Sequence, residues 1–305
     1  MSAIVFGHMN PDTDSTISAL AAADIYTKRG LAVTAAAQGA PTPDTQFVLD
    51  TFGLTAPAII DDVTGKDVYL VDFSDLAQGP KGLAEANVLG IVDHHKLGDV
   101  TTNSPLEAWI WPVGCTGTVL KAMYDFYGIE IPKAIAGGLM CAILSDTVLF
   151  KSPTCTDADK AAVKALAAIA GVDYEKVGMD MLKVKSSIDG IPAKDLVFRD
   201  YKDFDMNGKK VGIGQVELID IAMADGIKGD LRAELAKVKA ERGCHSVFLL
   251  LTDIMKEGSE MLINSDDIAV VEKAFGKKPE GDSVWLEGVL SRKKQVVPPF
   301  QTAFK

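Results

Sequence analysis

Histidine is scarce in this 305-residue sequence, and three of the four histidines stand close to aspartates. His8, Asp12 and Asp14 share one short segment, and Asp93-His94-His95 form a second one. Imidazole nitrogens combined with carboxylate oxygens suit Mn²⁺ or Co²⁺ and tolerate Mg²⁺. So many carboxylates do not fit a single tetrahedral structural zinc. The residue types therefore predict a metal centre, and the number of donors predicts two ions.

The candidate ligands all follow apolar runs of the chain. The apolar run 3–6 is followed by His8, Asp12 and Asp14, and the run 68–71 is followed by Asp72. The run 88–92 is followed by Asp93, His94 and His95, and the run 140–144 is followed by Asp146. Continuous apolar runs are typical of strands buried on both faces of a parallel sheet. The carboxyl ends of such strands meet at one edge, where ligands bind. We therefore expect these distant segments to converge.

The alternation of strand and helix patterns predicts an α/β fold. Strand-like runs at 3–6, 32–37, 68–71 and 88–92 alternate with helical patterns at 16–29 and 44–52, and further helices are expected at 116–127, 133–144 and 157–170. Thr156-Asp157 fit the start of the last helix and Gly171 fits its end. This pattern predicts a parallel sheet covered by helices on both faces.

A second, smaller domain is expected after residue 186. Hydrophobic periodicity lapses before Gly190 and Pro192, so we place the first domain at 1–186, a hinge at 187–192 and the second domain at 193–305. Strand patterns at 211–218, 246–251 and 260–263 and helix patterns at 230–242 and 267–275 predict an α/β unit with a mixed sheet.

Composition excludes several classes of protein. The net charge of −11 argues against nucleic-acid partners, because phosphate backbones are bound through concentrated Lys and Arg. No apolar stretch is long enough for a membrane span or a signal peptide. The four cysteines show no paired spacing, which favours a reducing cytoplasm.

Each cluster also has a plain structural interpretation. Asp12, Asp14 and Ser15 could cap the helix expected from residue 16, and Asp72 could simply begin a loop. Capping does not require His8, however, and a pair of buried or half-buried imidazoles at 94–95 needs partners. A basic triplet at 292–294 could be a solvated surface patch, although an acidic protein that binds an anion needs such cations.

Several motifs together resemble the DHH phosphoesterase superfamily. They are His8-x-x-x-Asp12-x-Asp14, Asp72, Asp93-His94-His95, Ser145-Asp146, Pro112-Val113-Gly114-Cys115-Thr116, the run from Phe150 to Asp157 and Ser291-Arg292-Lys293-Lys294-Gln295. The aspartate-histidine-histidine triplet is shared with exopolyphosphatases, RecJ-type nucleases and nanoRNases. The last two motifs are narrower, and with them the whole chain is similar to the manganese-dependent family II inorganic pyrophosphatases.

The resemblance implies a role for each candidate residue. His8 and Asp12 would bind one metal, Asp14, His94 and Asp146 the other, and Asp72 would bridge them. His95 would contact the substrate and, with Asp72, serve catalysis, while Lys202, Arg292 and Lys293 would bind phosphate. Two Mn²⁺ are implied, with Co²⁺ as a possible replacement and Mg²⁺ accompanying the substrate or substituting weakly. A homodimer is also implied.

The reaction expected from the resemblance is hydrolysis of inorganic pyrophosphate by a hydroxide that bridges the two metals. An exopolyphosphatase or a phosphodiesterase of short oligonucleotides is the alternative within the superfamily, and a non-catalytic metal or phosphate sensor is the alternative outside it. One departure stands out, because Asp72-Phe73-Ser74-Asp75 replaces the usual Asp-His-Asn continuation. This change puts the surroundings of the Asp72 ligand in doubt.

Overall fold

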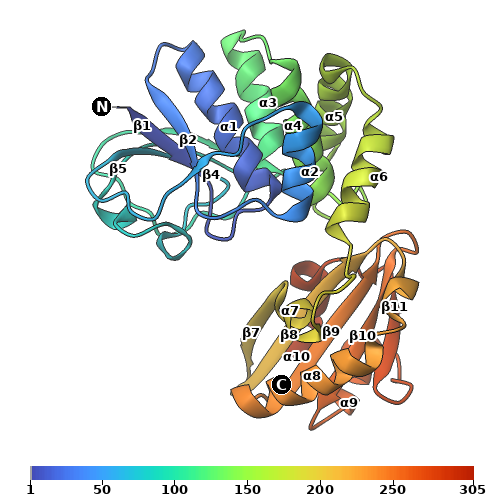
Figure 1. Ribbon diagram of the computed structural model, residues 1–305. Coiled ribbons are helices and arrows are strands. Elements are labelled where there is room, and N and C mark those ends of the chain that lie inside the picture. The colour runs from blue at the N-terminus through green and yellow to red at the C-terminus, as the bar shows by residue number, and fades with distance from the viewer. Residues whose placement is uncertain (1) are drawn as a thin grey trace. The chain divides into compact units, whose positions relative to one another are not determined.

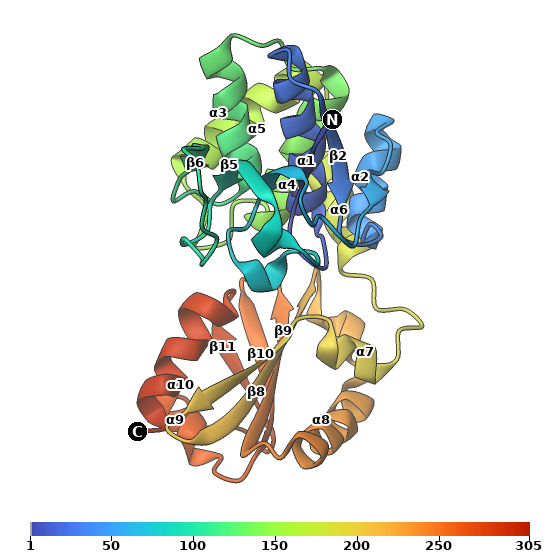
Figure 2. The ribbon, with the colours of Figure 1, turned by 90° about the vertical axis from the view of Figure 1, so that its left-hand side faces the viewer.

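The computed structural model describes residues 2–305, which divide into two compact units, unit 1 up to Val184 and unit 2 from Lys185 to Lys305. Figures 1 and 2 show the two units, each built around its own sheet. Within the described residues, no helix has the length and apolar character needed to cross a membrane.

Unit 1 contains a six-stranded sheet in which every neighbouring pair is parallel, in the order β3-β2-β1-β4-β5-β6. The strands are β1 (Ala3–Phe6), β2 (Val33–Ala37), β3 (Ala58–Ile59), β4 (Asp67–Val71), β5 (Asn87–Asp93) and β6 (Glu107–Ile110). The order reverses at β1, which lies between β2 and β4. Ligands bind near such a reversal, at the carboxyl ends of the strands.

The helices of unit 1 are α1 (Thr13–Lys28), α2 (Pro43–Phe52), α3 (Thr116–Tyr127), α4 (Lys133–Asp146), α5 (Asp157–Ala170) and α6 (Tyr174–Lys185). Figure 1 shows α1, α3 and α4 lying together beside the strands. On the sheet, Phe6, Leu70 and Ile91 join an apolar cluster with Leu83 of the short 3₁₀ helix η2 (Leu83–Glu85). Buried apolar side chains thus hold the strand ends in fixed positions.

Unit 2 contains a mixed five-stranded sheet in the order β11-β10-β9-β8-β7, in which only the β8–β9 pair is parallel. The strands are β7 (Tyr201–Met206), β8 (Lys209–Leu218), β9 (Ser246–Asp253), β10 (Gly258–Ser265) and β11 (Ser283–Glu287). The helices are α7 (Ala193–Phe198), α8 (Lys228–Arg242), α9 (Ala269–Phe275) and α10 (Val297–Ala303).

Strand β9 explains why unit 2 has helices on both sides of its sheet, as Figure 2 shows. All its residues are buried, and successive side chains point to opposite faces. Leu249 packs in a cluster with Leu231 and Leu235 of α8, whereas Phe248 packs in a cluster with Phe300 of α10. Because both faces of β9 are covered, the strand contains a continuous apolar run.

These features confirm the predicted fold class, a parallel-sheet α/β unit followed by a smaller unit with a mixed sheet. The first helix begins at Thr13, three residues earlier than predicted, because the Asp12 carboxylate accepts a hydrogen bond from the Ser15 amide and caps it there. Short or polar elements were missed by the sequence patterns. They are β3, β6, β7, β11, α6, α7 and α10.

Candidate metal centre

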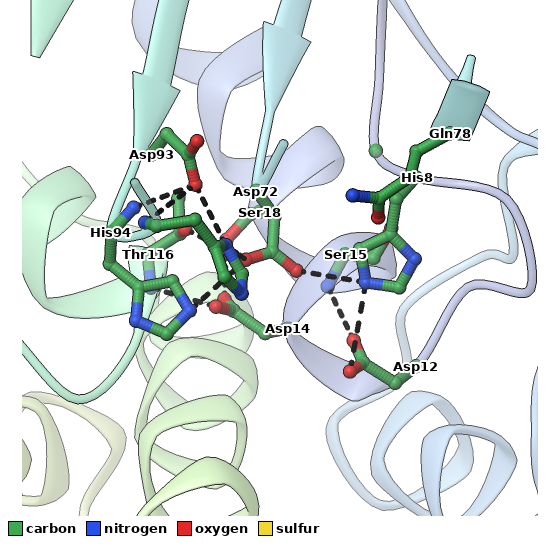
Figure 3. Close-up of polar contacts among 12 residues, drawn as sticks. His8, Asp12, Asp14, Ser15, Ser18, Asp72, Gln78, Asp93, His94 and Thr116 are labelled. Atoms are coloured by element: carbon green, nitrogen blue, oxygen red, sulfur yellow. Dashed lines mark hydrogen bonds and ion pairs between the residues drawn. The ribbon is translucent and has the colours of Figure 1, made fainter. Parts of the chain in front are cut away.

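The predicted metal ligands come from four separate parts of unit 1. His8 follows β1, Asp12 and Asp14 lie at the start of α1, Asp72 follows β4, His94 follows β5, and Asp146 ends α4. Asp146 thus arrives from a helix rather than from a strand of the sheet. Figure 3 shows Asp72 between His8 and His94, with Asp14 close by.

Asp72 lies at the centre of the cluster and its side chain is almost wholly buried. One oxygen, Oδ2, is 3.3 Å from His8 Nε2, and the other, Oδ1, is 3.4 Å from His94 Nε2. Its backbone φ of 66° is in the left-handed region, which aspartate tolerates better than most residues and which is often found at functional sites. The two oxygens of one carboxylate therefore face two different imidazoles.

Two groups of donors share Asp72. In the first, His8, Asp12 and Asp72 each offer a donor atom, and these atoms lie within 4.8 Å of one another. In the second, Asp72 is grouped in the same way with His94 and His95. A carboxylate common to both groups fits a bridge between two cations, and the nitrogen and oxygen donors fit Mn²⁺.

A third group lies on the inner side of the cluster, where Asp14, Cys115 and Asp146 offer donor atoms within the same 4.8 Å limit. Asp14 is fully buried and accepts hydrogen bonds from the backbone amides of Thr116 at 2.7 Å and Gly117 at 3.1 Å. These amides belong to the first turn of α3, where the helix dipole favours negative charge.

His95 differs from the other two histidines because its side chain is 41% exposed. Its Nδ1 lies 2.9 Å from Asp93 Oδ1, and this same oxygen accepts the backbone amides of His94 and His95. Asp93 is fully buried and so anchors the His95 imidazole together with the backbone of both histidines. With Nδ1 held in this way, Nε2 of His95 is the ring nitrogen left for a ligand.

The pKa shifts show how strongly these donors interact. Burial opposes a charged imidazole, but Asp12 and Asp72 outweigh it and raise the pKa of His8 to about 12. Asp72 likewise outweighs burial at His94 and raises its pKa to about 10. Burial and then repulsion by Asp72 raise the pKa of Asp14 to about 7, and burial raises the pKa of Asp146 well above its usual value. The site therefore holds protons wherever it holds no cations.

We expect Mn²⁺ binding to release protons. Because metals bind neutral imidazole and ionised carboxylate, the raised pKa values of His8, His94 and Asp14 mean that protons leave as the ion enters. The apparent Mn²⁺ affinity should therefore rise with pH from about 6 to 9. Calorimetric titration in buffers with different ionisation enthalpies measures the released protons, and a heat independent of the buffer would contradict this expectation.

The unusual Phe73-Ser74 pair is buried beside the site. Phe73 packs against Phe6 of β1, with ring centroids 6.0 Å apart. Ser74 Oγ accepts the Gly98 amide at 2.9 Å, and the Ser74 carbonyl accepts the Val100 amide at 3.1 Å. Phe73 thus packs the loop after β4 against β1, and Ser74 joins this loop to the loop after β5, which carries His95.

The three cations assigned to phosphate binding all lie in unit 2. Lys202 is exposed on β7, and Lys293 is exposed in the π-helical turn η4 (Arg292–Val296). Arg292 is buried, and its guanidinium donates to the Asp200 carboxylate at 2.7 Å and to the Ile213 carbonyl at 3.3 Å. In this conformation the Arg292 guanidinium is hydrogen-bonded to groups of its own unit.

The sequence patterns did not predict that Thr116 contacts two of the proposed ligands directly. Its hydroxyl donates to Asp72 Oδ1 at 3.0 Å while its amide donates to Asp14, so one residue orients two carboxylates. Cys115, a neighbour of Asp14 and Asp146, was also missed as a potential donor. Burial and the neighbouring carboxylates raise the pKa of this thiol well above its ordinary value, which keeps it protonated in the absence of metal. The available signal was their position at the start of a helix after Pro112-Val113-Gly114.

Comparisons with known proteins agree with this arrangement. Residues 2–143 match the model of the DHH family, N-terminal domain, and residues 179–303 match the DHHA2 domain. A relative from Archaeoglobus fulgidus is 50% identical over 98% of this chain and 97% of its own length. A relative from Methanothrix thermoacetophila is 45% identical over 99% of this chain and 98% of its own. Both are named manganese-dependent inorganic pyrophosphatases, the first as a probable one.

The fold and the donor set define a two-unit metalloprotein of the DHH and DHHA2 type. A crystal structure of a Methanococcus jannaschii family II inorganic pyrophosphatase matches with a TM-score of 0.80 and 44% identity, covering 100% of this chain and 99% of that one. The chain belongs to the family of manganese-dependent inorganic pyrophosphatases.

Proposed function

We propose that this protein hydrolyses inorganic pyrophosphate to two phosphates with the help of manganese. The observation that carries the proposal is the position of Asp72, which faces His8 with one oxygen and His94 with the other. Full-length relatives named as manganese-dependent pyrophosphatases support the same substrate.

The donor groups suggest how two Mn²⁺ ions would be held. We assign His8, Asp12 and Asp72 to one ion, and Asp14, His94, Asp146 and Asp72 to the other. Co²⁺ should replace Mn²⁺ because nitrogen and oxygen sites generally bind it at least as tightly, whereas Mg²⁺ prefers oxygen donors alone. Mg²⁺ is therefore assigned to the substrate or to weaker substitution.

Two such cations supply charge neutralisation and a water of lowered pKa, which hydrolysis of a highly charged anhydride needs. Asp72 fixes the spacing of the donor groups, and Thr116 holds Asp72 Oδ1 in place. His95 is assigned to the substrate because its ring is partly exposed and Asp93 fixes its Nδ1, which leaves Nε2 to donate to or accept from a phosphate oxygen.

Phosphate binding by unit 2 is assigned to Lys202, Arg292 and Lys293. The two lysines are exposed and can act as point charges toward an anion. Arg292 is held by Asp200 and so would have to exchange this carboxylate for phosphate. Residues 187–192 contain no helix or strand and are kept as the proposed hinge.

The substrate is tested by measuring phosphate release from pyrophosphate, tripolyphosphate and a dinucleotide under identical Mn²⁺ concentrations. We expect pyrophosphate to be preferred by at least about 100-fold in kcat/KM. The second phosphate group of pyrophosphate supplies binding energy, and the corresponding groups of tripolyphosphate and the dinucleotide lie in different positions. Preference for tripolyphosphate or the dinucleotide would favour the alternative phosphoesterase activities. Stoichiometric pyrophosphate binding without turnover would favour a sensor.

We also propose that the protein is a homodimer joined through β6. This strand lies at the edge of the unit 1 sheet, and an unpaired edge invites pairing with another chain. Trp109 of β6 and Phe126 of α3 have ring centroids 5.2 Å apart, and Phe126 is 70% exposed. An exposed aromatic patch along a free edge strand fits a symmetric contact between two copies.

Replacing Phe126 with glutamate should convert the dimer to a monomer, because the contact would then bury an unpaired charge. Light scattering after gel filtration measures the change. Ile59→Glu is the matched control, since Ile59 is 63% exposed on β3 at the opposite edge of the same sheet. A monomeric wild type, or a dimer lost only in the Ile59 variant, would exclude β6 as the interface.

A further inference from the structure

The segment from Val113 to Thr118 orients three of the proposed metal ligands. The Val113 carbonyl lies 3.1 Å from His94 Nδ1, the amides of Thr116 and Gly117 bind Asp14, and the Thr116 hydroxyl binds Asp72. Partners of this kind fix the orientation of metal ligands and strongly affect metal affinity. The position of this segment therefore affects both proposed ion sites.

Asp159, on the first turn of α5, holds this segment in place through two hydrogen bonds. Its Oδ2 accepts the Gly114 amide at 2.9 Å, and its Oδ1 accepts the Thr118 hydroxyl at 2.5 Å. Asp159 is fully buried and is itself held by the amide and hydroxyl of Thr156, each at 2.7 Å. The two ends of the segment thus share one rigid carboxylate.

Close packing around Gly114 supports the same arrangement. A Cβ at this position would lie 2.7 Å from Thr147 Cγ2 and 2.8 Å from Asp159 Oδ2, so a larger residue would push the segment away. Thr147 directly follows Asp146, and Val148, Leu149 and Phe150 have φ values of 49°, 51° and 68°. Such a left-handed turn of non-glycine residues persists only where its surroundings hold it in place.

We propose that Asp159 is a positioning residue for the metal centre. This inference rests on the proposed function, because it assumes that Asp14, Asp72 and His94 bind metal. It gives a role to the run from Phe150 to Asp157, which connects Asp146 to α5 and supplies Thr156 as the cap that holds Asp159. Asp159 acts through the Val113–Thr118 segment and contacts none of the proposed ligands itself.

The test compares Mn²⁺ affinity in four variants, measured from the electron paramagnetic resonance signal of free Mn²⁺. Asp159→Ala should weaken binding by about 10- to 100-fold, because the segment loses its anchor. Asp159→Asn keeps one acceptor oxygen and should restore most of the affinity. Thr118→Val, which removes a single hydrogen bond, should weaken binding by about threefold.

Asp173→Ala is the matched control. Asp173 Oδ1 accepts the amides of Glu175 and Lys176 at the start of α6, so its loss removes a helix cap in the same unit without touching the Val113–Thr118 segment. This variant should melt about 2–4 °C lower yet bind Mn²⁺ within about twofold of the wild type.

Equal Mn²⁺ affinity in the wild type, Asp159→Ala and Asp173→Ala proteins would overturn the proposal and leave Asp159 as a helix cap alone. If Asp159→Ala does not fold, unchanged affinity in Thr118→Val has the same meaning. A wild-type protein that binds no Mn²⁺ would instead contradict the proposed metal centre. The two failures are therefore distinguishable.

Discussion

Replacing Asp72 with asparagine should reduce the kcat for pyrophosphate hydrolysis by at least about 1,000-fold, even at saturating Mn²⁺. An amide offers one oxygen and a nitrogen without a free lone pair, so it cannot give one acceptor to each imidazole group. The distances of 3.3 Å to His8 and 3.4 Å to His94 place one carboxylate oxygen beside each imidazole. Initial rates of phosphate release measure the loss.

In this variant, the effect on folding stability has to be distinguished from the effect on the rate of hydrolysis. Hydrogen bonds from His8 and His94 hold the pKa of Asp72 below its usual range against the effect of burial. Asp72 therefore stabilises the metal-free protein above the pKa of an unfolded aspartate and loses this contribution in acid. Asp72→Asn should accordingly melt at a lower temperature, and its rate is compared where both proteins are folded. Asp61→Asn, at an exposed position, serves as the control.

A rate within tenfold of the wild type in a folded Asp72→Asn protein would exclude Asp72 as the shared ligand. A loss equally large in Asp61→Asn would show that charge alone, and not position, determines the rate.

Replacing Asp14 with asparagine should reduce the number of tightly bound Mn²⁺ ions from two to one, and activity should fall with it. Asp14 is assigned to one ion only, while His8, Asp12 and Asp72 keep the donors of the other. Loss of a direct ligand should cost more than the 10- to 100-fold typical of its hydrogen-bonding partners, so we expect at least about 100-fold weaker binding at the affected site. Equilibrium dialysis with metal analysis gives the stoichiometry.

The control for this variant is Asp50→Asn, which removes an exposed carboxylate from α2 and should leave both ions bound. Full activity of Asp14→Asn at saturating Mn²⁺, or two ions still tightly bound, would remove Asp14 from the site.

Local sequence patterns were sufficient to predict the buried strands that end at the metal centre. They did not predict the edge strands of the two sheets. Apolar runs ending in Asp72 and Asp93 predicted buried strands, because only strands covered on both faces are apolar throughout. Helix α3 begins at Thr116 and ends at Tyr127, as its pattern predicted, while edge strands such as β6 and β7 are short or rich in polar residues and gave no clear pattern.

What could not be predicted depends on contacts between distant residues. Nothing near Asp14 in the sequence indicates that α3 points its first amides at this carboxylate, since the partners are 102 and 103 residues away. Asp159 and Gly114 are separated by 45 residues in the same way. Arg292 was expected to be available for phosphate, yet it is paired with Asp200, 92 residues earlier. Such partners are set by packing, which local periodicity does not record.

The most direct measurement is an anomalous difference map, collected at the manganese absorption edge from crystals of the Mn²⁺-loaded protein. The account predicts two peaks in each chain, both in contact with the Asp72 carboxylate, one beside His8 and Asp12 and the other beside Asp14, His94 and Asp146. A single peak, or peaks that do not touch Asp72, would contradict it.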